Sequence, residues 1–128
     1  MDKNSNSINW FEIPALDVAR AQKFYETIFD LKMSPMQEMM GMKMVSFPVD
    51  MGNGKASGAL VQSQMHKPST DGCVIYLNAD PKIQTVIDRI EKAGGKVAMP
   101  RTEITPEIGY MAFLIDTEGN KVALHARA

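Results

Sequence analysis

The sequence has little of several features that would point to a particular class of protein. Its 128 residues contain a single cysteine, Cys73, so no disulfide can form within the chain, and one thiol is compatible with a reducing compartment. Lys and Arg number 14 against 15 Asp and Glu, without the basic cluster that nucleic-acid-binding proteins usually carry. We therefore expect no nucleic-acid partner.

Long hydrophobic segments are also missing. The longest apolar runs fall far short of the roughly 18 residues that a membrane-spanning helix requires. The N-terminal MDKNSNS is polar, and no hydrophobic signal segment follows it. We predict a cytoplasmic protein with no membrane partner. What is present, 45% apolar and 23% charged residues, is typical of an ordinary globular chain.

A first strand and helix are predicted near the N-terminus. Residues 8–16, INWFEIPAL, are rich in the aromatic and β-branched types that strands favour. They stop at Asp17, whose carboxylate suits the N-cap of a helix. Apolar residues then recur at helical spacing until about Asp30, where we expect this helix to end.

A second strand and helix are predicted in the other half. Residues 73–79, CVIYLNA, form the strand, and Asp80 and Pro81 suit the N-cap and first turn of the helix that follows. Apolar residues within 83–90 repeat at i, i+3, i+4 and i+7, and Gly94 is placed to end the helix with a left-handed residue.

These two segments belong to an internal repeat. NWFEIPALD corresponds to GCVIYLNAD at an offset of 63 residues, and FPVDMGNGK at 47–55 corresponds to FLIDTEGNK at 113–121 at an offset of 66. Between each helix and the later segment there is room for two more strands joined by a turn. The repeat therefore predicts two βαβββ units.

We expect the units to cover about residues 8–61 and 73–126. The polar segment 62–72 is the expected linker, and it is too short to separate independent domains. The sequence thus predicts one domain over residues 1–128. Its two curved sheets would each carry a helix on the outer face and meet around a cleft.

The paired pattern resembles the vicinal oxygen chelate superfamily, which contains glyoxalase I, bleomycin-resistance proteins and extradiol dioxygenases. The segments DVARAQKFYETIFD, AGGKV and DTEGNKVALH carry the resemblance, which covers roughly residues 8–126. It implies an α+β fold in which two tandem βαβββ modules form an open-barrel cleft. It also implies a homodimer, because members commonly pair through these sheets.

The resemblance also says where a metal would bind. Catalytic members place one ligand on the first strand of each unit and one on the last strand, and these positions fall here on Trp10, Cys73, near Ala59 and on Ala123. An indole, a thiol and two methyl groups cannot supply the His or carboxylate donors of a divalent site. We predict no metal and no other cofactor. We expect Trp10, Cys73, Tyr110 and Ala123 to bind a small apolar or planar ligand in the cleft.

Glu12 and His125 are the candidate catalytic residues. Alternation along the strands places Glu12 on the cleft face and His125 on the same face as Ala123. A carboxylate and an imidazole that face one pocket can act as acid and base, although a solvated Glu12 and a surface His125 are the plainer alternative. His66, in the linker, is expected to be exposed to solvent.

Three functions stay open from the sequence. The chain could be a small-molecule-binding member of the superfamily without the usual metal, acting as a binder or as a metal-free enzyme. It could be a glyoxalase-like lyase whose metal is bound by displaced ligands such as Glu12 and His125. It could also be a dimeric accessory module without chemistry.

Overall fold

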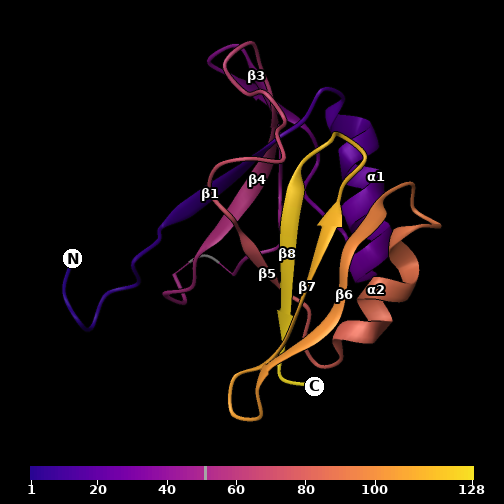
Figure 1. The fold of residues 1–128 in the computed structure, drawn as a ribbon. Coiled ribbons are helices and arrows are strands. Elements are labelled where there is room, and N and C mark those ends of the chain that lie inside the picture. Colours follow the sequence, from indigo (N-terminus) through magenta and orange to yellow (C-terminus); the bar gives the residue numbers. More distant parts are fainter. Residues whose placement is uncertain (51) are drawn as a thin grey trace.

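The computed structural model describes residues 1–50 and 52–128, which contain two helices and eight strands (Figure 1). Each half of the chain has the order strand, helix and three strands. Module 1, residues 10–62, contains β1 (Trp10–Pro14), α1 (Val18–Phe29), β2 (Gln37–Met39), β3 (Met42–Ser46) and β4 (Ser57–Gln62). Module 2, residues 76–126, contains β5 (Tyr76–Asn78), α2 (Ile83–Ile90), β6 (Lys96–Thr105), β7 (Gly109–Ile115) and β8 (Lys121–Ala126).

Each module forms one four-stranded sheet with the same topology. The strand orders are β1-β4-β3-β2 and β5-β8-β7-β6. The first strand of each module runs parallel to the last, and the other pairs are antiparallel. The described strands form two separate sheets and no closed barrel. The predicted α+β fold of two βαβββ modules is therefore confirmed.

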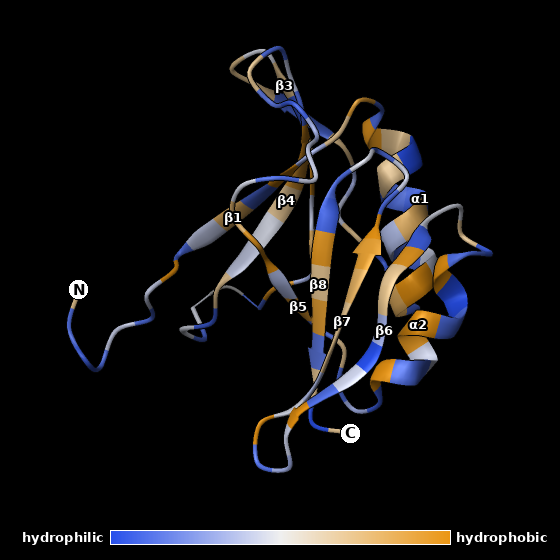
Figure 2. Cartoon of the chain, in the orientation of Figure 1, coloured by the Kyte–Doolittle hydropathy of each residue, from blue (hydrophilic) through white to orange (hydrophobic). Residues whose placement is uncertain are grey.

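Both helices use one apolar stripe to cover the sheets. α1 buries five residues and α2 buries Ile83, Val86, Ile87 and Ile90, the spacing that the sequence predicted. The two helices contact each other and lie together on one side of the molecule (Figure 1). Their apolar residues form a single core with those of both sheets (Figure 2). In the described part of the chain, neither helix is long and apolar enough to cross a bilayer.

The two helices begin differently. Asp17 is the N-cap of α1, as predicted, and its carboxylate accepts two backbone N–H groups of the first turn, each at 3.1 Å. The prediction that Asp80 caps the second helix is wrong. α2 begins at Ile83, and Lys82 at its N-cap makes no side-chain bond. Asp80 lies too early in the chain to reach the first turn, and it accepts the backbone N–H of Arg127 instead.

The turn between β7 and β8, residues 116–120, joins the two modules. Glu118 accepts both backbone N–H groups that directly precede α1, each at 2.8 Å, and its carboxylate pairs with the Arg20 guanidinium at 2.7 Å. Asn120 donates its side-chain N–H to the carbonyl of Pro14 at 2.7 Å. Because Glu118 and Asn120 are each only 5% exposed, their side chains are an internal part of the fold.

A buried hydroxyl strengthens this junction. The Tyr25 hydroxyl donates to a carboxylate oxygen of Asp116 at 2.7 Å, in a contact that the solvent does not reach. Burial, and then the negative charge of Asp116, raise the pKa of Tyr25 well above its usual value. The hydroxyl therefore stays protonated and serves as a permanent donor between the modules.

Candidate functional site

A large, mainly apolar cavity lies between the two modules. Its volume is about 670 Å³, within the range of about 300 to 1,000 Å³ that small-molecule sites usually have. We call it the apolar cavity. Among the residues that line it are Phe11, Phe29, Leu31 and Phe47 from module 1 and Tyr76 and Leu77 from module 2.

The aromatic wall of this cavity follows from the direction of the side chains along β1 and from their packing. Phe11 points from β1 toward the helix side of the sheet, where it packs against the core. Its ring lies 5.7 Å from that of Phe47, which directly follows β3. Tyr76, at the start of β5, is 50% exposed, so the cavity is open to solvent along the edge of module 2.

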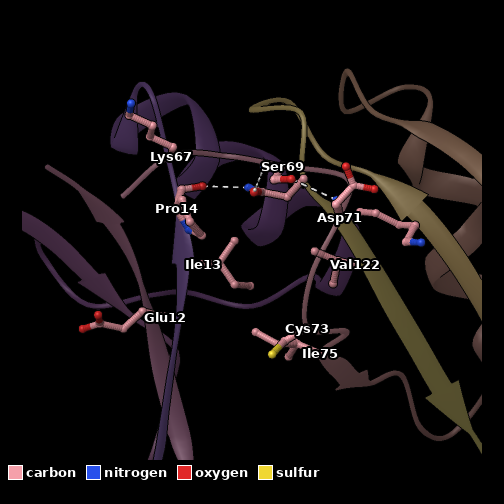
Figure 3. Close-up of a pocket in the computed structure, with 11 residues that line it drawn as sticks. Glu12, Ile13, Pro14, Lys67, Ser69, Asp71, Cys73, Ile75 and Val122 are labelled. Carbon is pink, nitrogen blue, oxygen red and sulfur yellow. Dashed lines mark hydrogen bonds between the residues drawn. The ribbon is translucent and has the colours of Figure 1, made fainter. Parts of the chain in front are cut away.

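A smaller cavity of about 210 Å³ lies where the linker passes between β1 and β8 (Figure 3). Ile13, Ile75, Val122 and the predicted ligand residue Cys73 form its inner wall. Glu12 also lines it, but its carboxylate points away from Cys73 (Figure 3). Because its volume is below the usual range for ligand sites, this cavity is the weaker candidate.

Glu12 pairs with a histidine that the sequence analysis did not connect to it. The alternation was predicted correctly, since Ile13 is buried in the core and Glu12 lies on the opposite face. Its carboxylate is 2.8 Å from Nε2 of His66, whose side chain is only 15% exposed. The expectation that His66 is solvent-exposed is therefore wrong, because the linker folds back over β1.

His125 and Glu12 are not brought together. Nε2 of His125 is 2.8 Å from the carbonyl oxygen of Ile108, in the turn between β6 and β7. Since a carbonyl can only accept, this nitrogen carries a proton and donates it. The pairing of Glu12 with His125 that the sequence suggested is replaced by the pairing of Glu12 with His66.

The register of module 2 differs from the one inferred from the sequence. Trp10 lies opposite Ser57 in the pairing of β1 with β4, and Tyr76 lies opposite Ala123 in the pairing of β5 with β8. Tyr76 is therefore the counterpart of Trp10, whereas Cys73 precedes β5. The sequence offset was counted back from Asp80, but the N-cap of α2 is Lys82, two residues later, so the count placed the matching strand position too early in the chain.

Aromatic rings explain the small residue at position 123. Ala123 lies between Tyr76 on β5 and Phe113 on β7, whose ring centroids are 6.4 Å apart, and it is fully buried. Tyr110 lies on the opposite face of β7, packs against the core and carries the guanidinium of Arg101 at 3.5 Å from its ring centroid. The structure therefore does not place Tyr110 beside Ala123.

The residues present do not fit the metal that the family implies. By strand register, Trp10 and Tyr76 occupy matching first-strand positions, and Ser57 and Ala123 lie opposite them on the last strands. Within residues 1–50 and 52–128, no three His, Cys, Asp or Glu side chains are grouped so that they could hold a metal ion. A divalent site needs several such donors to converge.

Comparisons with known proteins agree with this architecture. Residues 8–48 match the family described as bleomycin resistance protein-like N-terminal. A glyoxylase-like domain-containing protein from Didymella fabae is 31% identical over 94% of this chain and 93% of its own length. The chain belongs to the glyoxalase/bleomycin-resistance family.

Solved structures of other proteins have a similar fold to this chain. A hypothetical protein from S. aureus superposes with a TM-score of 0.66 at 19% identity, over 94% of each chain. A glyoxalase/bleomycin resistance protein from Albidiferax ferrireducens superposes with a TM-score of 0.64 at 17% identity, over 96% of this chain and 100% of the other. At these identities the similarity supports the fold alone.

Proposed function

We propose that this member of the glyoxalase/bleomycin-resistance family binds a small apolar or planar molecule in the apolar cavity, without a metal ion at the family's usual positions. The observation that supports the proposal is the aromatic-lined space of about 670 Å³ between the modules. Each Å² of apolar surface that a ligand removes from water there contributes about 25 cal/mol.

The lining of the cavity favours a ligand with one polar end. Most of the wall is aromatic or aliphatic, and Asn78 at the end of β5 adds a side-chain amide to it. The side-chain oxygen of Asn78 accepts the backbone N–H of Asp80 at 2.9 Å, and its N–H donors can orient a carbonyl, hydroxyl or carboxylate on an otherwise apolar ligand. Few polar groups in an apolar wall are typical of small-molecule sites.

A homodimer is the second candidate use of this surface. Ile8, Val74 and Tyr76 line the cavity and are 49%, 40% and 50% exposed. Exposed apolar residues grouped at one opening also suit contact with a second copy of the chain. In that case the partner would cover the cavity, and the fold would act as a dimeric module.

The metal-dependent alternative has less support. A metal held by Glu12 and His125 would compete with the bond between Glu12 and His66 and with the bond between His125 and the Ile108 carbonyl. Stoichiometric Zn²⁺ or Ni²⁺ in the purified protein, with methylglyoxal–glutathione turnover lost on chelation, would contradict our proposal.

Binding can be tested with 1-anilinonaphthalene-8-sulfonate, a planar apolar probe with one charged end. Val74→Trp fills part of the apolar cavity, and Val49→Trp is its matched control, because Val49 is similarly exposed at 38% and does not line the cavity. We expect Val74→Trp to weaken probe binding at least tenfold and Val49→Trp to leave it unchanged. Circular dichroism should confirm that both variants are folded.

The outcomes separate the two uses of the surface. Equal probe affinity in the two variants, or no binding by the folded wild type, would overturn the ligand proposal. Light scattering over a range of protein concentrations reports the dimer. If the wild type is a dimer and Val74→Trp is a monomer, the opening is covered by a second copy.

A further inference from the structure

Three side chains form a continuous hydrogen-bonded series where the linker crosses β1. The hydroxyl oxygen of Ser63 is 2.7 Å from Nδ1 of His66, and Nε2 of His66 is 2.8 Å from a carboxylate oxygen of Glu12. Ser63 and His66 belong to the linker, whereas Glu12 comes from β1, 54 residues before His66. The fold therefore assembles the series from distant parts of the chain.

The chemistry of the three groups sets the direction of the protons in the form with a neutral His66. An ionised carboxylate can only accept, so the neutral imidazole of His66 must carry its proton on Nε2 and donate it to Glu12. Nδ1 is then a lone-pair acceptor, and the Ser63 hydroxyl donates to it. These are the members of a nucleophilic triad, a hydroxyl, a base and a carboxylate that orients the base, with the two ring nitrogens in exchanged roles: here Nδ1 faces the hydroxyl and Nε2 faces the carboxylate.

A local turn explains only part of this arrangement. The backbone N–H of Met65 also donates to the Ser63 oxygen at 3.1 Å, as serines do in turns. A turn accounts for the nearness of Ser63 to His66, three residues later. It does not account for Glu12, which brings a charged acceptor to the far nitrogen of the same ring.

A cavity of about 330 Å³ gives a substrate access to the series. We call it the linker cavity. Ser63, His66, Gln64, Leu16 and Lys43 are among the residues that line it. No described residue lines both this cavity and the apolar cavity, so the two sites are separate.

We propose that Ser63, His66 and Glu12 form a nucleophilic site that transfers the acyl group of small esters. The Ser63 oxygen attacks the ester carbonyl carbon while its proton moves to Nδ1 of His66, and Glu12 stabilises the imidazolium that forms. Collapse of the tetrahedral intermediate breaks the bond to the leaving alkoxide, which takes the proton from Nδ1. Water then attacks the acyl-serine by the same route and releases the carboxylic acid.

The surrounding charges are compatible with this step. Glu12 on β1 pairs with His66, Lys43 on β3 lines the same cavity as His66, and Lys67 follows His66 in the chain. Lys43 lines the same cavity as Ser63, so the cavity wall includes a positively charged residue, and positive charge stabilises the negative charge that develops on an ester oxygen. The cavity volume of about 330 Å³ is near the lower end of the usual range for ligand sites, which suits a small ester.

Labelling with a fluorophosphonate probe, which reacts with activated serines, tests the proposal directly. We expect one covalent adduct on Ser63, located by tandem mass spectrometry, and a burst of p-nitrophenol from p-nitrophenyl acetate. Because a general base contributes about 10²- to 10⁴-fold, His66→Asn should slow labelling at least 100-fold. Ser69→Ala, in the same linker, is the matched control and should label at the wild-type rate.

A second variant keeps the test decisive if His66→Asn does not fold. Glu12→Gln retains a similar shape but loses the charge that stabilises the imidazolium, and it should slow labelling at least tenfold. An unlabelled Ser63 in the folded wild type, or labelling of folded His66→Asn or Glu12→Gln at the wild-type rate, would overturn the proposal. Ser63→Ala should still bind 1-anilinonaphthalene-8-sulfonate in the apolar cavity. If the nucleophilic site is disproved, the proposed binding function is therefore not affected.

Discussion

A similar sequence precedes the last strand of each module, and the second copy bonds the two modules together through its side chains. DMGNGK at 50–55 and DTEGNK at 116–121 share their first Asp and their last Lys. In module 2 the polar side chains of the turn are buried against module 1. In module 1, Asp50 and residues 52–55 are exposed, and residue 51 lies outside the described part of the chain.

The residues that differ between the two copies explain why, among the described residues, only side chains of the second copy are buried. Glu118 and Asn120 make the bonds to module 1, and at an offset of 66 their counterparts are Gly52 and Gly54. A glycine has no side chain with which to reach a neighbouring strand. The bonds between the modules are therefore made by residues that the two copies do not share.

Removing the docking carboxylate should have the largest effect on stability. Glu118→Ala leaves two backbone N–H groups ahead of α1 and the Arg20 guanidinium without their acceptor. We expect a loss of about 2–4 kcal/mol in the free energy of unfolding, measured by urea denaturation. Asp50→Ala in the exposed copy is the control and should stay within about 0.5 kcal/mol of the wild type. Equal losses would mean that the two turns do not differ in role.

Removing the buried hydroxyl should have the next largest effect. Tyr25→Phe deletes the donor to Asp116 and keeps the ring in the core. Because a hydrogen bond to a charged group contributes about 1.5–3 kcal/mol, we expect a loss in that range by urea denaturation. Tyr76→Phe, on the half-exposed tyrosine of module 2, is the control. A loss below about 0.5 kcal/mol in Tyr25→Phe would contradict a bonding role.

The N-terminal ends of the two helices also differ between the modules, and we expect a smaller effect on stability there. Asp17→Ala removes a cap that accepts two N–H groups of α1, and it should cost about 1 kcal/mol. Asp80→Ala, at the related place in module 2, removes no cap of α2 and should cost less. Urea denaturation measures both. A larger loss in Asp80→Ala would show that the Arg127 contact matters more than the cap.

Local patterns predicted the fold well, because helices and strands follow from spacing and alternation. The stripes of α1 and α2, the cap at Asp17 and the face of Glu12 are all confirmed. The candidate site was harder, because its contacts join distant segments. Neither the pairing of Glu12 with His66 nor the placement of Tyr76 opposite Ala123 follows from local spacing.

Some of these contacts did leave a signal in the sequence. Aligning the two turns sets Glu118 and Asn120 against glycines, which indicates that module 2 uses those side chains for something beyond the turn. Ser63 and His66 are three residues apart in a polar segment, a spacing at which a turn brings side chains together. The third member, Glu12, could only be found from the path of the linker.

The pH dependence of stability should give the smallest effect. Burial acts to raise the pKa of Glu118, but the hydrogen bonds from Arg20, from the backbone of Asp17 and from Thr117 outweigh it and leave the pKa lowered. A carboxyl group whose pKa is lower in the folded state adds stability above its unfolded value of about 4.3. That stability is lost as the pH falls through the folded-state pKa.

Glu118→Gln removes this titration and keeps the shape of the side chain. We expect the difference in unfolding free energy between wild type and variant to be widest near pH 7 and to shrink below about pH 4. The change should be modest, because Arg20 is half exposed and solvent screens its attraction. Asp50→Asn should show no such trend. A difference that is the same at pH 3.5 and pH 7 would mean that Glu118 acts in the junction through hydrogen bonds alone.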